Sequence, residues 1–182
     1  GCAAATMPTR PSRDVRRSAV RLAERWLGEA NHLLHAAVIA RMDDADWSVR
    51  RQLAASLGAV PPGAREAAVA ALLERHGEDP IVMDAALSGL RGSEPAVLER
   101  LLQGADQTAA RDAAISMLSA TIVRGAQETA VQRLFERAAA GDRSAWQRSA
   151  LLRGLEVALV GAEMPGTPPR RTEAAAPGAP CP

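Results

Sequence analysis

The sequence predicts an all-α fold in which antiparallel helix hairpins stack into an α-solenoid. Apolar residues recur at intervals of three or four, as in Val20, Ala23, Trp26 and Leu27, which is the period of an amphipathic helix. Aromatic residues make up only 2% of the chain and tyrosine is absent, which disfavours an aromatic-rich sheet. A short motif also recurs at a spacing typical of helical hairpins, about 30–47 residues.

The recurring motif is a polar capping residue, then a β-branched residue, then an alanine-rich helix. Residues 14–17 (DVRR) return as residues 48–51 (SVRR), 34 positions later, and a similar pattern follows at residues 79–82. Weaker copies begin at Asp106 and Asp142 with more variable spacing. The positions that we predict to carry the repeat are Val15, Arg16, Asp46, Val49, Arg50, Asp79, Val82, Asp142 and Trp146.

Structural roles are the prediction for these positions. The valines are expected to pack in the core between helices. Arg16 and Arg50 are expected to reach an acidic side chain or an open carbonyl in the adjacent repeat, which would form a ladder, and ligand binding is the alternative. The side chains of Asp46, Asp79 and Asp142 are expected to accept hydrogen bonds from free N–H groups at helix starts.

The tryptophans Trp26, Trp47 and Trp146 are expected to pack in the core or between repeats. Trp47 and Trp146 occupy comparable positions near the starts of predicted helices, whereas Trp26 lies late in its helix. Anchoring a partner at an interface is the alternative for these large side chains.

Glycines, prolines and capping residues such as Ser12 and Asn31 separate the apolar stripes. The predicted helices cover residues 12–28, 31–42, 46–59, 62–76, 80–91, 94–103, 107–124, 126–139 and 143–160. Those after residue 30 pair into hairpins at 31–59, 62–91, 94–124 and 126–160.

Helix 12–28 resembles the second helix of a hairpin whose first helix is missing. We therefore expect an uncovered apolar edge there, including some of Val20, Ala23, Trp26 and Leu27. The absent initiator methionine suggests a fragment of a longer protein. The predicted organisation is a disordered segment at 1–11, a repeat domain at 12–160 with one half repeat and four hairpins, and a flexible linker rich in proline and alanine at 161–182.

Charge and composition bear on the class of partner. The formal net charge is +1, and every basic side chain is arginine because the chain has no lysine. Arginine favours phosphate contacts, but acidic residues are interspersed, so codon usage in a GC-rich genome is the preferred explanation of the bias. Nucleic acid is therefore not the favoured partner. No apolar run reaches the roughly 18 residues that a membrane span requires.

Candidate reactive groups are few. His32 and His35 are three residues apart and two such histidines can share a metal, but no third ligand is evident. The acidic run at residues 43–46 lacks the alternating ligands of a calcium loop. Cys2 and Cys181 form no CxxC motif, and whether they pair is left open. No phosphate loop, GxSxG or HExxH motif is present, so we expect no catalytic, cofactor or metal site and no enzymatic activity.

Three segments resemble HEAT repeats: residues 46–58 (DWSVRRQLAASLG), 84–90 (DAALSGL) and 146–154 (WQRSALLRG). They look especially like the HEAT repeats fused to bacterial sugar dehydrogenases of the soluble glucose or sorbosone type. In such proteins a β-propeller that binds pyrroloquinoline quinone usually precedes the repeats, and a c-type cytochrome domain often follows. This chain has neither a propeller nor a CxxCH haem motif, so no cofactor residue is carried over. The resemblance implies a periplasmic or otherwise exported parent protein.

The expected function is a non-catalytic scaffold or protein-interaction module, as part of a larger bacterial redox protein. Its expected partners are another protein or neighbouring domains of the same polypeptide. A free-standing adaptor that binds a protein or peptide on its concave surface is one alternative, and a HEAT-like protein that binds nucleic acid is another.

Overall fold

The computed structural model describes residues 11–161, so the predicted disordered segment 1–11 and linker 161–182 lie outside the described residues except at their boundaries. Within residues 11–161 every regular element is a helix and no strand occurs, which confirms the all-α class. The α-helices are α1 (Arg13–Leu27), α2 (Leu34–Ile39), α3 (Trp47–Ser56), α4 (Ala64–His76), α5 (Pro80–Ser88), α6 (Glu94–Leu102), α7 (Ala109–Arg124), α8 (Glu128–Ala139) and α9 (Ala145–Val160). Two short 3-10 helices, η1 (Ala40–Asp43) and η2 (Leu57–Ala59), extend α2 and α3.

The start of α2 and the end of α5 each differ from prediction by three residues. Asn31 has a φ of 60°, in the left-handed region, and the helix begins only at Leu34 without a side-chain cap. Asparagine adopts this conformation more readily than most residues, so it ends the preceding turn instead of starting a helix. The predicted Asn31 cap is therefore wrong, whereas Ser12 caps α1 by accepting a hydrogen bond from the Val15 N–H at 3.4 Å.

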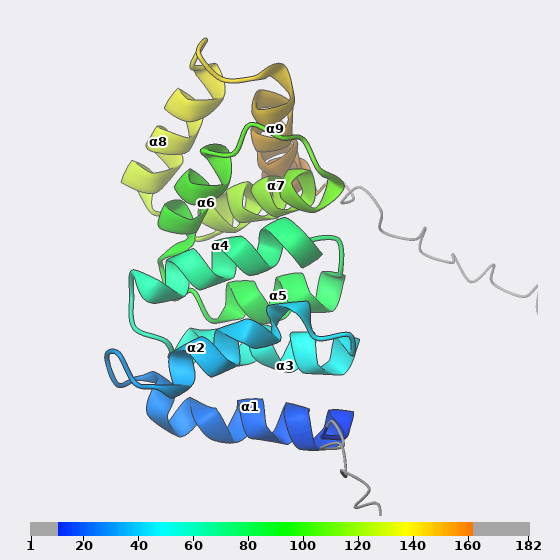
Figure 1. The fold of residues 1–182 in the computed structure, drawn as a ribbon. Helices are drawn as coiled ribbons and strands as arrows, with labels where there is room; N and C mark the ends of the chain where they lie inside the picture. The colour runs from blue at the N-terminus through cyan, green and yellow to red at the C-terminus, as the bar shows by residue number, and fades with distance from the viewer. Residues whose placement is uncertain (1–10, 162–182) are drawn as a thin grey trace, which may run out of the picture.

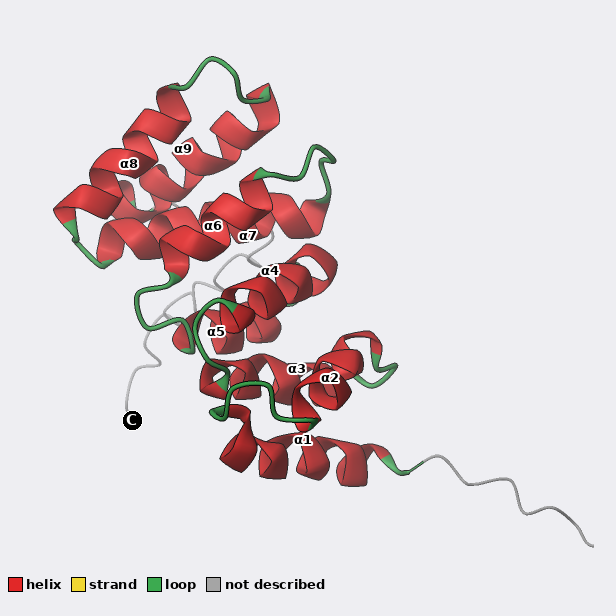
Figure 2. Cartoon of the chain, turned by 60° about the vertical axis from the view of Figure 1, so that its left-hand side comes forward, coloured by secondary structure: helices red, strands yellow, loops and turns green. Residues whose placement is uncertain are grey.

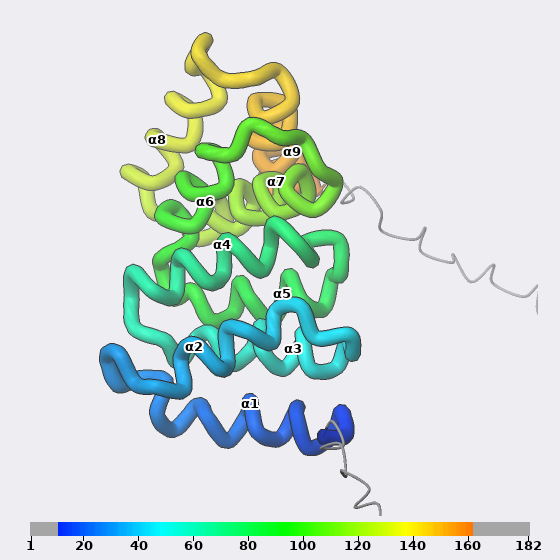
Figure 3. Tube along the Cα trace, in the orientation of Figure 1, coloured from blue at the N-terminus to red at the C-terminus, as the bar shows by residue number. Residues whose placement is uncertain are grey.

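The helices follow one another along the molecule in chain order, and most of the packing joins a helix to the one two places further along the chain (Figure 1). Helix α1 packs on α3 and α3 on α5, while α4 packs on α5, α6 and α7, and α7 packs on α9. The turned view in Figure 2 shows the same progression from α1 at one end to α8 and α9 at the other, and the tube in Figure 3 traces this path. Each helix pair therefore covers an apolar face of the next pair.

One hydrophobic cluster extends through these helices from α1 to α9. Its largest side chains with less than 2% exposure are Leu27, Leu53, Leu57, Leu72, Leu73, Leu90, Leu101, Ile115, Leu118 and Leu151. Because this burial is shared between adjacent helices, no single hairpin covers its own apolar stripe, and the pairs stabilise one another.

A very close helix contact joins α7 to α9. Gly154 of α9 faces Ser116 and Ser119 of α7, and a Cβ atom at position 154 would overlap the Ser116 carbonyl oxygen and the Ser119 Cβ. Both serines are completely buried, and the Ser116 hydroxyl donates a hydrogen bond to the Ala150 carbonyl at 3.1 Å. Only a residue without a Cβ atom allows the two backbones to approach this closely.

Candidate functional site

The valines of the predicted repeat occupy two different environments. Val49 is completely buried and Val82 is 1% exposed, so both lie in the core as predicted. Val15, in contrast, is 58% exposed, and its predicted core position is wrong. The reason is that α1 is the first helix of the described part, and no helix within residues 11–161 covers the face on which Val15 lies.

Of the two arginines predicted to reach the adjacent repeat, Arg16 does so and Arg50 does not, and Arg51 forms the second such pair. Arg16 of α1 donates two hydrogen bonds to the Asp44 carboxylate, at 2.8 and 2.7 Å, and Arg51 of α3 donates two to Asp79, both at 3.1 Å. Each pair joins residues 28 positions apart. Arg50 instead donates to the carbonyls of Asp44 and Ala45, which lie in its own hairpin, so its prediction as a rung between repeats is wrong. Arg51, one residue later in α3, faces α5, whereas Arg50 faces the loop before α3.

Two of the three predicted aspartate caps are present. Asp46 accepts from the Ser48 N–H at 2.8 Å, and Asp79 accepts from the Ile81 and Val82 N–H groups. Hydrogen bonds from the Ser48 side chain and backbone hold the pKa of Asp46 below its ordinary value. Asp142 is not a cap, because α9 begins at Ala145 with Ser144 in the capping position and Asp142 remains exposed in the turn.

The tryptophans differ in a similar way. Trp146 is partly buried and packs against the hydrophobic cluster, as predicted. Trp47 is 54% and Trp26 is 41% exposed, so neither is a core side chain. Trp47 lies under the Arg51 guanidinium, 4.2 Å from the ring centre, which is a cation–π geometry.

The histidines serve local structure. The His32 Nδ1 accepts from the Leu34 N–H at 3.2 Å, and the His35 Nε2 lies 2.9 Å from the Leu27 carbonyl oxygen. Across residues 11–161 no three His, Cys, Asp or Glu side chains gather closely enough to hold a metal ion. In the same part of the chain, no helix has the length and apolar character needed to cross a membrane.

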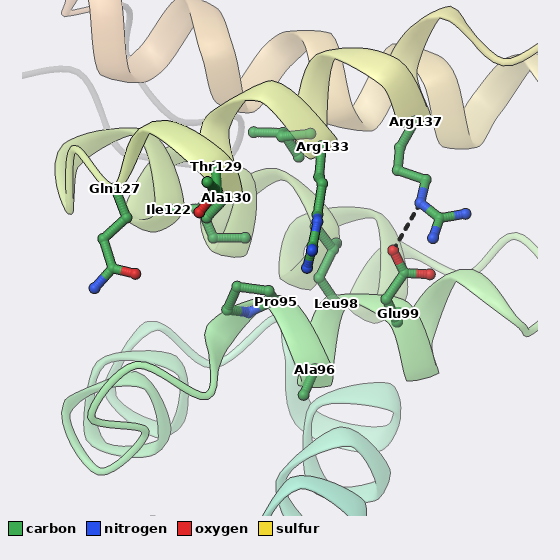
Figure 4. Close-up of a pocket in the computed structure, with 11 residues that line it drawn as sticks. Pro95, Ala96, Leu98, Glu99, Ile122, Gln127, Thr129, Ala130, Arg133 and Arg137 are labelled. Carbon is green, nitrogen blue, oxygen red and sulfur yellow. Dashed lines mark ion pairs between the residues drawn. The ribbon is translucent and has the colours of Figure 1, made fainter.

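A groove between α6 and α8 is a candidate site with both apolar and charged lining residues. Figure 4 shows α8 passing over α6 with the lining side chains between the two helices. The groove has a volume of about 460 Å³, and its buried apolar floor is formed by Leu98, Ile122 and Leu134. It continues past Pro95 and Gln127 into a second hollow beside the turn between α7 and α8. The two hollows share Pro95, Ile122, Gln127 and Ala130 and therefore form one continuous surface.

Some charged side chains of the groove are paired with each other, and one is not. Glu99 of α6 forms an ion pair with Arg137 of α8 at 2.9 Å (Figure 4), and Arg143 approaches the same carboxylate at 3.8 Å. Arg133 also extends into the groove from α8, but it forms no ion pair or hydrogen bond with any residue in the range 11–161. One cation in a mostly apolar groove is therefore available to a ligand carboxylate.

Neither this groove nor its charged residues were predicted from the sequence. Arg133 and Arg137 are one helical turn apart and flank the buried Leu134, so an arginine pair beside an apolar stripe was the detectable signal. It was missed because the predicted sites came from repeat motifs, and α8 carries no copy of the motif. Nor did the repeat motif identify Asp44, whose side chain is 1% exposed and pairs with Arg16.

Comparison with known proteins adds no relative: no protein-family model, curated protein or solved structure matches the chain.

Proposed function

We propose that this chain is a non-catalytic scaffold, built as an α-solenoid of HEAT-like hairpins, that binds a protein partner or neighbouring domains of its own polypeptide. The succession of antiparallel helix pairs supports this architecture (Figure 1). So do side-chain pairs that recur between residues 28 positions apart, Arg16–Asp44, Arg51–Asp79 and Arg65–Ser93. A regular spacing of this kind is expected when similar hairpins stack with similar geometry.

The α6/α8 groove is the observation that carries the binding role. It combines a buried apolar floor with Arg133, a cation that no residue of the described range neutralises. Apolar contacts supply affinity, and a single charge-assisted hydrogen bond supplies orientation. The preferred ligand is therefore an apolar segment that carries a carboxylate, such as a short acidic stretch of a partner protein.

The resemblance to the HEAT segment of sugar dehydrogenase–cytochrome fusions supports a narrower version of this proposal. In that version the bound neighbours are redox domains of an exported bacterial protein, and the scaffold sets the distance between them. A free-standing adaptor would use the same groove for a separate protein. The near-zero net charge of the chain disfavours the nucleic-acid alternative, which requires a continuous cationic surface.

Selection from a random peptide library tests the proposal on the purified chain. We expect selected peptides to combine apolar residues with Asp or Glu, and to perturb NMR signals of α6 and α8. Arg133→Glu should abolish this binding. Arg100→Glu is the matched control, because Arg100 is an exposed arginine of α6 that does not line the groove. Peptides that perturb the NMR signals of α6 and α8 but bind Arg133→Glu and the unmodified chain equally well would refute a role for the groove.

A further inference from the structure

Helix α1 carries a second apolar stripe that faces solvent. Val15, Ala19, Leu22 and Trp26 follow one another at helical spacing, and Val15, Leu22 and Trp26 are 58%, 62% and 41% exposed. The buried stripe of the same helix consists of Val20, Ala23 and Leu27 and faces the rest of the molecule. An apolar side of this size on a helix surface is a characteristic of interaction sites. The edge expected from the sequence is therefore present, but of its four predicted residues only Trp26 is exposed.

The 34-residue spacing of the repeat shows what this stripe corresponds to. Val15, Ala19, Leu22 and Trp26 correspond to Val49, Leu53, Ser56 and Val60. All four of the later residues are buried, with exposures of 0%, 0%, 1% and 2%. The difference lies in the neighbours, because α2 and η1 precede α3 and η1 packs on it, whereas no helix precedes α1 within residues 11–161. The exposed stripe thus occupies the positions that a preceding helix helps to cover in the following hairpin.

A groove lies beside this stripe, between α1 and α2. It has a volume of about 320 Å³, with Val20, Ala23 and Val38 at its base and Val15 and Leu34 among its walls. Its only charged lining residues among those described are Arg16 and Arg41. The groove is a trough between two helices, and a third helix fits such a trough better than a flat partner surface does.

The charge of α1 restricts the chemistry of a partner. The helix contains five arginines and two acidic residues: Arg13, Arg16, Arg17, Arg21, Arg25, Asp14 and Glu24. Arg16 is neutralised by Asp44, but Arg21 and Arg25 are exposed and form no ion pair within the described residues. A second copy of this chain would place two such cationic helices against each other, so self-association through this face is disfavoured.

We infer that the α1/α2 groove binds an amphipathic helix of a partner protein, with an aliphatic stripe flanked by carboxylates. The helix lies along α1, its aliphatic side chains cover Val15, Ala19, Leu22 and Trp26, and its carboxylates meet Arg21 and Arg25, because Arg16 and Arg41 already lie within ion-pair distance of Asp44. This inference rests on the proposed role of the chain as an interaction module, but it assigns a different surface and a different ligand from the α6/α8 groove.

Fluorescence anisotropy with two synthetic peptides tests the inference on the full chain. Both peptides carry the same leucine and alanine stripe on a helix-forming sequence, and the flanking residues are glutamate in one and lysine in the other. We expect the glutamate peptide to bind at least about tenfold more tightly than the lysine peptide. Leu22→Glu should weaken its binding by about tenfold or more, because it places a carboxylate within the apolar stripe.

Ile81→Glu is the matched control, because Ile81 is 50% exposed on α5, away from the groove. Equal affinity for the two peptides, no binding, or binding that Leu22→Glu leaves unchanged would overturn the inference. So would self-association in light scattering, or binding to phosphatidylserine vesicles without binding to the glutamate peptide. Sensitivity to Arg133→Glu and not to Leu22→Glu would place the peptide in the α6/α8 groove, so that the proposed function stands and this inference fails.

Discussion

Gly154→Ala is expected to destabilise the protein although alanine is the better helix former. Gly154 lies within α9, and its Cα faces the backbone of α7. The added Cβ would overlap the carbonyl oxygen of Ser116 and the Cβ of Ser119, and would lie 3.0 Å from the Ala120 nitrogen. These atoms belong to a helix backbone and to a buried short side chain, so none of them can rotate away.

The magnitude follows from two opposing terms. Relief of the overlap requires α7 and α9 to separate by roughly 1 Å, and overpacking of this kind costs about 3 kcal/mol at the upper end of its usual range. Replacing glycine inside a helix recovers about 1 kcal/mol from backbone entropy. The net loss is therefore about 2 kcal/mol, which for a chain of this size lowers the Tm by roughly 4–8 °C.

Urea unfolding followed by circular dichroism at 222 nm measures this change. Gly141→Ala is the control, because a Cβ at position 141 has no neighbouring atom within 4 Å and the residue lies in a turn. We expect that variant to be neutral or slightly stabilised. A Gly154→Ala protein as stable as the unmodified chain would show that α7 and α9 are not packed as closely as described.

Three further predictions concern stability. Val49→Asp should lower the free energy of unfolding by more than about 3 kcal/mol, because it places a carboxylate in the core. Val15→Asp, at the corresponding exposed position, should lower it by less than about 0.5 kcal/mol. Equal urea midpoints for the two variants would contradict the assigned burial. Asp44→Asn should cost about 3 kcal/mol by leaving Arg16 opposite a neutral amide, and Asp43→Asn, whose side chain is 73% exposed, should have little effect in the same assay. Burial would raise the pKa of Asp79, but hydrogen bonds from Arg51 and two backbone N–H groups outweigh it and lower this pKa below the ordinary 3.8. The unmodified chain should therefore be more stable than Asp79→Asn by a constant amount above pH 3.8, and this difference should disappear as the pH falls through the lower folded-state pKa. A difference in urea midpoint between the two proteins that grows on acidification would refute the assignment.

Helix positions were predictable from the sequence because apolar periodicity and capping residues are local signals. Residues 12–28 carry both signals, with Ser12 as the predicted cap, and helix α1 occupies them to within one residue at either end. The start of α2 was not predictable from these signals, because Asn31 is as suitable for a helix cap as for the left-handed turn that it adopts.

The environment of a repeat position depends on its neighbours, and this limited the prediction of sites. Val15 and Val49 share a motif, but only Val49 has helices on every side. Likewise, the choice of Arg51 over Arg50 depends on which of two adjacent side chains faces α5, a rotation of about 100° that residue types alone do not specify. The α6/α8 groove depends on the distance between two helices, which no motif encodes.

The contact at Gly154 has a consequence for recognition as well as for stability. Helix α8 is joined to α9 and packs on it, so the position of α9 against α7 also determines how far α8 stands from α6. Gly154, which is buried between α7 and α9 and does not line the groove, therefore adjusts the aperture of the groove that holds Arg133. Under the proposed binding role, a larger side chain at position 154 would alter which ligands fit between α6 and α8 without changing any residue that touches them.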